Sequence, residues 1–250
     1  MLNRVKAFVK GTPLAVPFIW TKARFAKPAT QNDEALILKA LLSRFVIPKC
    51  FIEFGFGGWE FNCAPLAFEW DGLLLDGDKY NIAIAKTILP RRVEARQLWI
   101  TRETLSEVKN WAEGKDIGIL SIDVDGNDYW FWQELLFLKP SMLIAEYNST
   151  LGLRLITIPY DPSFNYKEHK GWTYYGASLT ALSKLFALHD YSLIEVSTSG
   201  VNAFFIRNDL LGKHDRPLDP TMAYRELLHD DGSRADERWD KIKHRDFVTV

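Results

Sequence analysis

The sequence predicts an α/β protein whose mostly parallel sheet carries helices on both faces. Apolar runs of strand length alternate with helical patterns between residues 32 and 148, which is the rhythm of βα units. These runs are apolar throughout, as strands that are buried on both faces require. The last two runs are separated by the short segment "TSG", a spacing that is typical of a hairpin.

The elements of the first part follow from their apolar spacing and from the turn residues between them. Asn32 and Asp33 offer an N-cap for a helix over "EALILKALLSRF", and Pro48 closes that region. We expect strands at residues 50–54, 72–76, near 92–100, 117–123 and 141–148. We expect helices between them at residues 80–89, 104–114 and 127–138.

The rhythm changes after Asn148, where a long segment rich in aromatic and turn residues begins. We expect a helix at residues 178–190 after it, and then two strands at 191–197 and 201–207. From Asn208 the chain is highly charged.

The chain has 250 residues, enough for one large α/β domain or two small ones. We expect three parts, namely an N-terminal arm (1–31), a folded domain (32–211) and a charged C-terminal extension (212–250). The arm is basic, and its apolar stretch is interrupted by Pro17 and too short to span a bilayer. We expect the arm to pack on the domain or on a second subunit of a homo-oligomer, and a weak contact with a membrane surface is the alternative.

Composition limits the partners of the protein. The hydrophobic share is 47%, the charged share is 25% and the net charge is −1, as in an ordinary soluble globular protein. A nucleic-acid-binding protein usually carries a basic excess, so we predict no nucleic-acid partner. The two cysteines, Cys50 and Cys63, lack metal-ligand spacing, and we expect buried thiols in a reducing cytoplasm.

Acidic residues occur near the ends of several predicted strands. Glu53 lies within the first strand, and Asp76, Asp123 and Glu146 lie at the ends of three others. In open parallel sheets, ligands bind outside the carboxyl ends of the strands. These acids therefore indicate a ligand site at that edge.

The ordered motifs resemble those of class I S-adenosylmethionine-dependent methyltransferases, and most closely the FkbM-like enzymes of bacterial glycan and secondary-metabolite clusters. The resemblance covers residues 32–211 and rests on "FIEFGFG", "LLLDGD", "LSIDVDGNDYW", "AEYN" and the terminal hairpin. It implies a Rossmann-like, doubly wound, mostly parallel seven-stranded sheet with a C-terminal antiparallel hairpin. It also implies that S-adenosylmethionine is the cofactor, and that the reaction is O-methylation of a sugar-containing small molecule or glycan intermediate.

The resemblance also implies which residues bind the cofactor. Gly55 and Gly57 would let the backbone approach it, Glu53 would lie near its amino-acid end, and Asp76 would hold the ribose hydroxyls. The full implied set is Glu53, Gly55, Gly57, Asp76, Asp78 and Thr101. The alternative is that the glycines and the Asp76–Asp78 segment form ordinary turns.

For catalysis we expect Asp123 as the base, with Asp125 and His169 as further candidates. A divalent metal, Mg²⁺ or Mn²⁺, would be held by Asp123, Glu146 and Asn148, whose oxygen ligands suit such ions. The alternatives are that Asp123 and Asp125 cap the following helix, and that Glu146 and Asn148 bond the backbone of the following loop.

Trp172, Tyr174 and Tyr175 lie in the loop that should cover the substrate. Their rings suit stacking on a sugar, and packing on the domain is the alternative.

Two other functions remain open at this point. One is a Rossmann-type nucleotide-sugar or dinucleotide enzyme, although the last glycine of the G-x-G-x-x-G pattern is replaced by Glu60. The other is a non-catalytic scaffold that keeps the methyltransferase fold.

Overall fold

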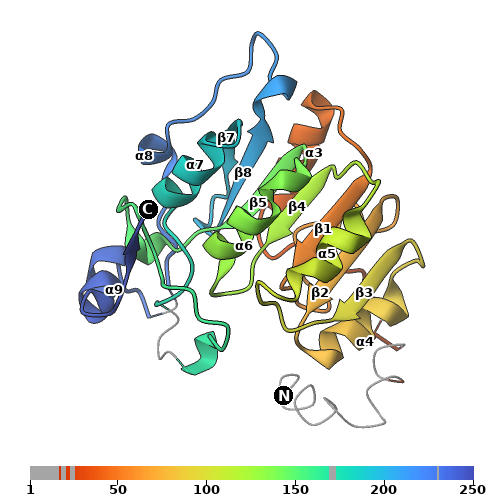
Figure 1. The fold of residues 1–250 in the computed structure, drawn as a ribbon, viewed down its shortest axis with the longest axis horizontal. Helices are drawn as coiled ribbons and strands as arrows, with labels where there is room; N and C mark the ends of the chain where they lie inside the picture. The colour runs from red at the N-terminus through yellow and green to blue at the C-terminus, as the bar shows by residue number, and fades with distance from the viewer. Residues whose placement is uncertain (1–16, 18–20, 23–25, 169–172, 230) are drawn as a thin grey trace.

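The structure is a computed structural model and describes residues 17, 21–22, 26–168, 173–229 and 231–250. Most of the predicted N-terminal arm lies outside the described residues. Figure 1 shows a central twisted sheet with helices packed along it.

The central sheet has seven strands in the order β3-β2-β1-β4-β5-β8-β7. The strands are β1 (Cys50–Phe54), β2 (Asp71–Asp76), β3 (Val93–Gln97), β4 (Ile119–Ile122), β5 (Met142–Glu146), β7 (Tyr191–Val196) and β8 (Asn202–Arg207). β1 to β5 run parallel, and β8 pairs antiparallel with both β5 and β7. The predicted Rossmann-like, mostly parallel seven-stranded sheet with a terminal hairpin is confirmed.

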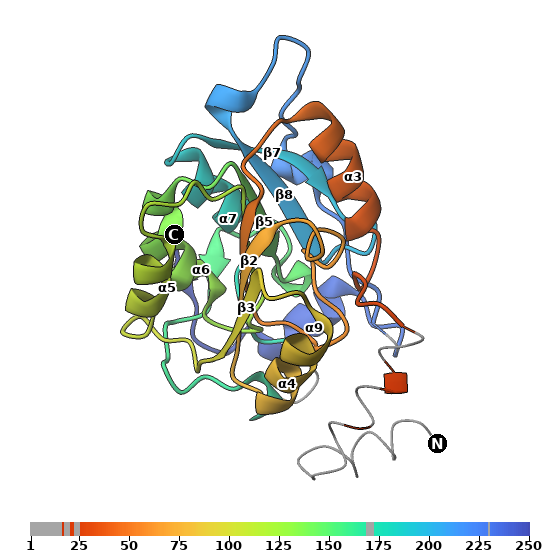
Figure 2. The ribbon, with the colours of Figure 1, turned by 90° about the vertical axis from the view of Figure 1, so that its right-hand side faces the viewer.

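Helices cover both faces of this sheet, as Figure 2 shows from the side. The helices are α3 (Glu34–Arg44), α4 (Lys79–Ile88), α5 (Leu105–Ala112), α6 (Asp128–Leu135), α7 (Leu179–Ala187), α8 (Pro220–Ala223) and α9 (Ala235–Ile242). Short 3₁₀ turns lie at Leu136–Leu138, Ser149–Leu151, Tyr166–Glu168 and Asn208–Leu210. α5, α6 and α7 pack on one face, and α3 and α4 on the other.

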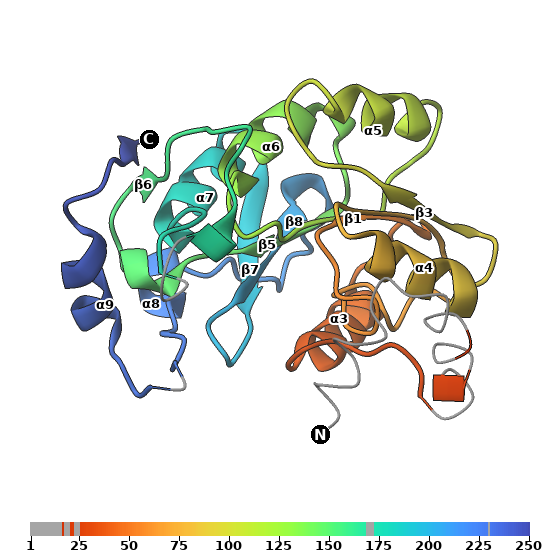
Figure 3. The same cartoon turned by 90° about the horizontal axis from the view of Figure 1, so that it is seen from below.

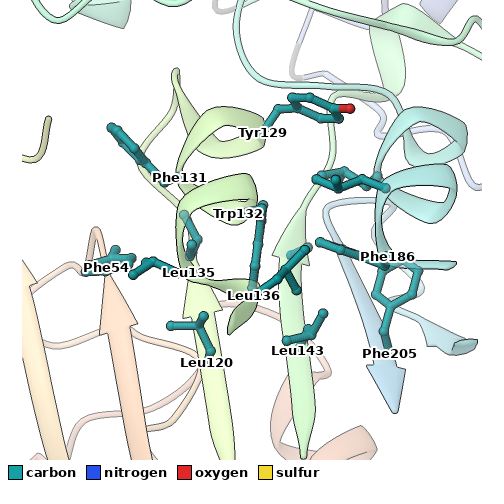
Figure 4. Packing of buried hydrophobic residues seen from close by; sticks show 14 of the residues in the cluster. Phe54, Leu120, Tyr129, Phe131, Trp132, Leu135, Leu136, Leu143, Phe186 and Phe205 are labelled. Atoms are coloured by element: carbon teal, nitrogen blue, oxygen red, sulfur yellow. The ribbon is translucent and has the colours of Figure 1, made fainter. Parts of the chain in front are cut away.

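Alternate strand residues feed the two layers of core. In β1, Ile52 and Phe54 join the core under α5 to α7, whereas Phe51 joins the core under α3 and α4. Figure 4 shows the aromatic centre of the first layer, where the rings of Trp132 and Phe186 are 5.0 Å apart and nearly perpendicular. This packing fixes α6, and with it the loop that joins β4 to α6.

No helix joins β1 to β2. Residues 55–70 instead form successive turns, including bonds from Ala64 N to Phe61 O and from Leu66 N to Cys63 O. Cys50 at the start of β1 and Cys63 among these turns are free and buried, as the sequence predicted.

The C-terminal extension packs against the loop that follows β5. β9 (Val248–Thr249) pairs antiparallel with β6 (Ile156–Thr157), and both lie near the C-terminus in Figure 3. Arg238 of α9 is buried, and its Nε donates to Thr150 Oγ1 at 3.0 Å. The end of the chain therefore stabilises a loop that lies beside the carboxyl edge of the sheet.

Within the part of the chain that the structure describes, no helix combines the length and the apolar character that crossing a membrane requires.

Candidate functional site

A cleft of about 820 Å³ lies at the carboxyl edge of the parallel strands. Its walls come from the turn after β1, the segments that follow β2, β3 and β4, and residues 162–166 of the loop after β6. This is the edge at which open α/β sheets bind their ligands.

Gly55 begins the turn after β1 and is required by packing. Its φ is +67°, and a Cβ at this position would lie 1.6 Å from the backbone oxygen of Asp123. The ends of β1 and β4 therefore approach more closely than any residue with a side chain would allow. Gly57 lies in the same turn, where a Cβ would be 3.2 Å from Glu60 O, and both glycines line the cleft.

Glu53 lies at the floor of the cleft and is almost fully buried. Its carboxylate accepts hydrogen bonds from Asn62 N at 2.6 Å and from Cys63 N at 2.8 Å. Burial raises the pKa of Glu53 to about 7, although the two N–H groups act in the opposite direction. Glu53 therefore holds the turn region in place and also contributes a carboxyl group to the cleft.

Asp76 connects the end of β2 to the glycine turn. Its Oδ2 accepts from Phe56 N at 3.2 Å, and its Oδ1 accepts from Asp78 N at 2.5 Å. Asp78 caps α4 by accepting from Tyr80 N at 2.9 Å. Both acids line the cleft, and burial raises the pKa of Asp76.

Thr101 is not brought to the cleft by the structure. Its hydroxyl accepts from Thr104 N at 3.4 Å, and its own N donates to Thr104 Oγ1 at 2.8 Å. The wall after β3 comes instead from residues 97–100. Sequence reasoning missed Trp99, whose side chain is half exposed and whose Nε1 donates to Pro162 O at 3.0 Å.

Three carboxylates meet beside the cleft. One oxygen each from Asp123, Asp125 and Glu146 lies within 4.8 Å of the others. Burial raises the pKa of Asp123 and of Glu146. The charge of Asp125 raises the pKa of Asp123 further, and the charge of Asp123 raises the pKa of Glu146 further. An octahedral Mg²⁺ or Mn²⁺ with ligands at about 2.1 Å separates its ligand oxygens by about 3 to 4.2 Å, so this donor set fits such an ion.

Asn148 does not join that cluster. Its Oδ1 accepts from Thr150 N, and its Nδ2 donates to Thr173 O and Tyr175 O, all at 2.9 Å. The amide thus holds the loop after β5, which is the role that the alternative interpretation gave it.

Asp128 shapes the loop between β4 and α6. Its Oδ1 accepts from Val124 N and its Oδ2 from Gly126 N, both at 2.9 Å. Both N–H groups precede α6, and Asn127, the N-cap residue of α6, makes no side-chain capping bond. Asp125 adopts a φ of +53°, which is uncommon for a residue other than glycine.

The loop after β6 forms the opposite wall. Asn127 Nδ2 donates to Asp161 O at 2.7 Å, and Asp161 N donates to Asn127 Oδ1 at 3.1 Å. Phe164 packs on Gly126, where a Cβ would lie 2.6 Å from the ring. These contacts tie residues 161–164 to the loop after β4.

The other predicted loop residues have separate outcomes. His169 and Trp172 lie outside the described residues. Tyr174 donates to Asp246 O at 2.7 Å and packs on Phe247 of the extension. Tyr175 is buried, and burial together with the nearby Glu146 raises its pKa.

No model of a known protein family matches this chain, and no curated protein matches it in sequence. Solved structures with a similar fold include an O-methyltransferase from Bacillus cereus in complex with SAH, at 15% identity and a TM-score of 0.45, covering 82% of this chain and 94% of that one. They also include the N-terminal domain of EvdMO1 in the presence of SAH and D-fucose, at 12% identity and a TM-score of 0.43, covering 76% and 94%. A third is a SAM-dependent methyltransferase from Geobacter sulfurreducens in complex with S-adenosyl-L-homocysteine, at 15% identity and a TM-score of 0.39, covering 74% of each chain. At these identities and scores, the likenesses carry no conclusion about the activity of this chain.

Proposed function

We propose that the protein is an S-adenosylmethionine-dependent methyltransferase of the FkbM-like type that methylates a hydroxyl oxygen of a sugar-containing small molecule or glycan intermediate. The observation that supports this most is the meeting of Gly55, Asp76 and Trp99 in one cleft at the carboxyl edge. Gly55 and Asp76 belong to the cofactor-binding set that the motif resemblance implies. The cleft is large enough for a nucleoside with an amino-acid chain.

The cofactor would lie across the turn after β1. Asp76 uses its oxygens for N–H groups, but a carboxylate has about four lone-pair sites and can also accept from ribose hydroxyls. Trp99 offers an exposed aromatic face at the wall after β3. Asp78 and Gly57 complete the predicted set that lines the cleft.

We also propose that Asp123, Asp125 and Glu146 hold Mg²⁺ or Mn²⁺. When bound, such an ion supplies Lewis acidity that lowers the pKa of a coordinated hydroxyl. Of the acids of this cluster, Asp123 and Asp125 line the cleft itself. They are therefore placed to orient an acceptor hydroxyl and to receive its proton, and His169 stays a candidate for that second role.

The primary test is calorimetric titration of the protein with S-adenosylmethionine and with S-adenosylhomocysteine. We expect micromolar binding by the native protein and a loss of at least about tenfold in Asp76→Asn, because a charge-assisted hydrogen bond contributes about 1.5–3 kcal/mol. The matched control is Asp71→Asn, which changes an exposed acid at the other end of the same strand. Binding of neither ligand by folded native protein would overturn the proposal.

We further propose that the protein acts in the cytoplasm, without a nucleic-acid partner, as its composition predicts. A homo-oligomer built through the N-terminal arm remains a prediction, and sedimentation of the protein with and without residues 1–25 would test it.

A further inference from the structure

A chain of hydrogen-bonded polar side chains lies buried at the floor of the cleft. Its members come from the first turn of α3, from β1, from the turns after β1, from β4 and from β8. All are at most 5% exposed, and they are Glu34, Glu53, Asn62, Ser121 and Asn202. Glu53 and Asn62 line the cleft, whereas the other three do not. Because burying polar groups costs free energy unless they are bonded, such a chain inside an apolar interior calls for an explanation.

The amide of Asn62 is the centre of this chain. Its Nδ2 donates to Ser121 Oγ at 3.1 Å, and its Oδ1 accepts from Asn202 Nδ2 at 3.3 Å. Asn202 Nδ2 also donates to Glu34 Oε1 at 3.0 Å. The side chain of Asn62 is therefore held between the strands β4 and β8.

The backbone of Asn62 in turn holds Glu53. Asn62 N donates to Glu53 Oε1 at 2.6 Å, and Cys63 N donates to Glu53 Oε2 at 2.8 Å. Both donors lie in turns, so their position depends on bonds such as those of the Asn62 amide. A carboxylate has about four lone-pair sites, and the two N–H groups together with the Cys63 thiol leave one for a donor from a ligand.

The far end of the chain carries a cost in stability. Asn202 Oδ1 is buried and has no hydrogen-bond partner among the described residues. An unpaired buried oxygen destabilises a fold, and an apolar side chain of similar size would avoid this cost. The amide of Asn202 is therefore better explained by the position that it gives to Asn62 than by a gain in stability.

We infer that Asn62, Ser121 and Asn202 are positioning residues, which hold the Glu53 carboxylate where it binds the amino group at the amino-acid end of the cofactor. This inference rests on the proposed function and on the cofactor end that the motif resemblance assigns to Glu53. Ser121 and Asn202 do not line the cleft, so they act on a ligand through Asn62 and Glu53. The adenosyl group would lie at other walls of the cleft and should not depend on them.

The test compares two ligands that share the adenosyl thioether and differ at the amino-acid end. S-adenosylhomocysteine has this end, whereas 5′-methylthioadenosine carries a methyl group in its place. Both are titrated calorimetrically at pH 8, above the pKa of about 7 of Glu53, so that the carboxylate is ionised. We expect the native protein to bind S-adenosylhomocysteine at least about tenfold more tightly, because hydrogen bonds between charged groups are strong.

Two variants remove the side-chain partners of the Asn62 amide, namely Ser121→Ala and Asn202→Ala. We expect each to weaken the binding of S-adenosylhomocysteine roughly three- to tenfold, while the affinity for 5′-methylthioadenosine stays within about twofold of native. The matched control is Asn208→Ala, which changes an exposed asparagine just after β8 and should alter neither affinity. Ser121→Ala removes only a hydroxyl group, so it decides the question if Asn202→Ala does not fold.

The outcomes distinguish the inference from the function on which it rests. Equal or greater weakening of 5′-methylthioadenosine, or no change with either ligand, would overturn the positioning role and leave the methyltransferase proposal standing. Native protein that binds the two ligands equally tightly would do the same. Failure of the folded native protein to bind either ligand would overturn both.

Discussion

The backbone oxygen of Asp123 lies where the side chain of residue 55 would begin, 1.6 Å from an ideal Cβ built on Gly55. This contact joins the ends of β1 and β4 and sets the width of the cleft floor. The first glycine of the motif therefore serves the protein's own packing, whether or not a ligand is bound.

Gly55→Ala should destabilise the fold severely, because the new methyl group meets backbone and the φ of +67° is unfavourable for alanine. We expect a loss of about 3 kcal/mol or more in the free energy of unfolding, measured with urea. The matched control is Gly114→Ala, which has a φ of +70° but open space around it, and should cost only about 1–2 kcal/mol. Equal losses in the two variants would contradict the packing role.

Glu53 should make stability depend on pH. Its pKa is about 7 in the folded protein and about 4.5 when unfolded, so the folded state holds the extra proton between these values. Stability therefore falls as the pH rises from about 4.5 to about 7 and levels off above, with a total change on the order of 3 kcal/mol.

Glu53→Gln removes this titration. Urea unfolding of both proteins should be measured at several pH values between 4.5 and 8.5. The difference between their free energies of unfolding should change across that window, because the contributions of the other acids are the same in both proteins and cancel in the difference. Parallel curves would show that Glu53 keeps an ordinary pKa.

Mn²⁺ binding should depend on Asp125. Asp125→Asn replaces one charged ligand of the three-carboxylate cluster, and we expect at least a tenfold weaker affinity, measured by electron paramagnetic resonance of free Mn²⁺. Glu113→Gln, which changes an exposed acid just after α5, should bind as the native protein does. Native protein that leaves all Mn²⁺ free, with and without S-adenosylhomocysteine, would rule out the metal site.

Asn127 should hold the cleft wall in place. Asn127→Ala removes both hydrogen bonds to Asp161, at a cost of about 1–3 kcal/mol, and hydrogen exchange should become faster in residues 161–166. Exchange in the strand β4 should stay unchanged. Unaltered exchange in residues 161–166 would show that other contacts, such as Trp99 with Pro162, suffice.

The strands could be predicted because burial on both faces leaves a continuous apolar run, as in "CFIEF". The predicted bounds of the third strand were the least exact. The strand ends at Gln97, and the apolar residues Leu98 to Ile100 form part of the cleft wall. Apolar character alone could not distinguish a residue that continues the strand from one that lines the cleft.

The site was predicted where it depends on strand ends and missed where it depends on distant loops. Asp76 ends β2 and Asp123 directly follows β4, so topology places both at the cleft. The partners of Asn148 lie 25 and 27 residues further along the chain, and no local pattern reveals them. Trp99 was missed because its apolar neighbours placed it inside the third predicted strand, whereas β3 ends at Gln97.

The pairing of β6 with β9 has a consequence for the order in which the protein matures on the ribosome. All seven strands of the central sheet have been synthesised once Arg207 is made, whereas Val248 and Thr249 come about forty residues later. Because domains generally fold as their segments emerge, the sheet can assemble while the loop after β5 still lacks its partner strand. Maturation of the cleft would then be the last step of biogenesis, separate in time from formation of the core.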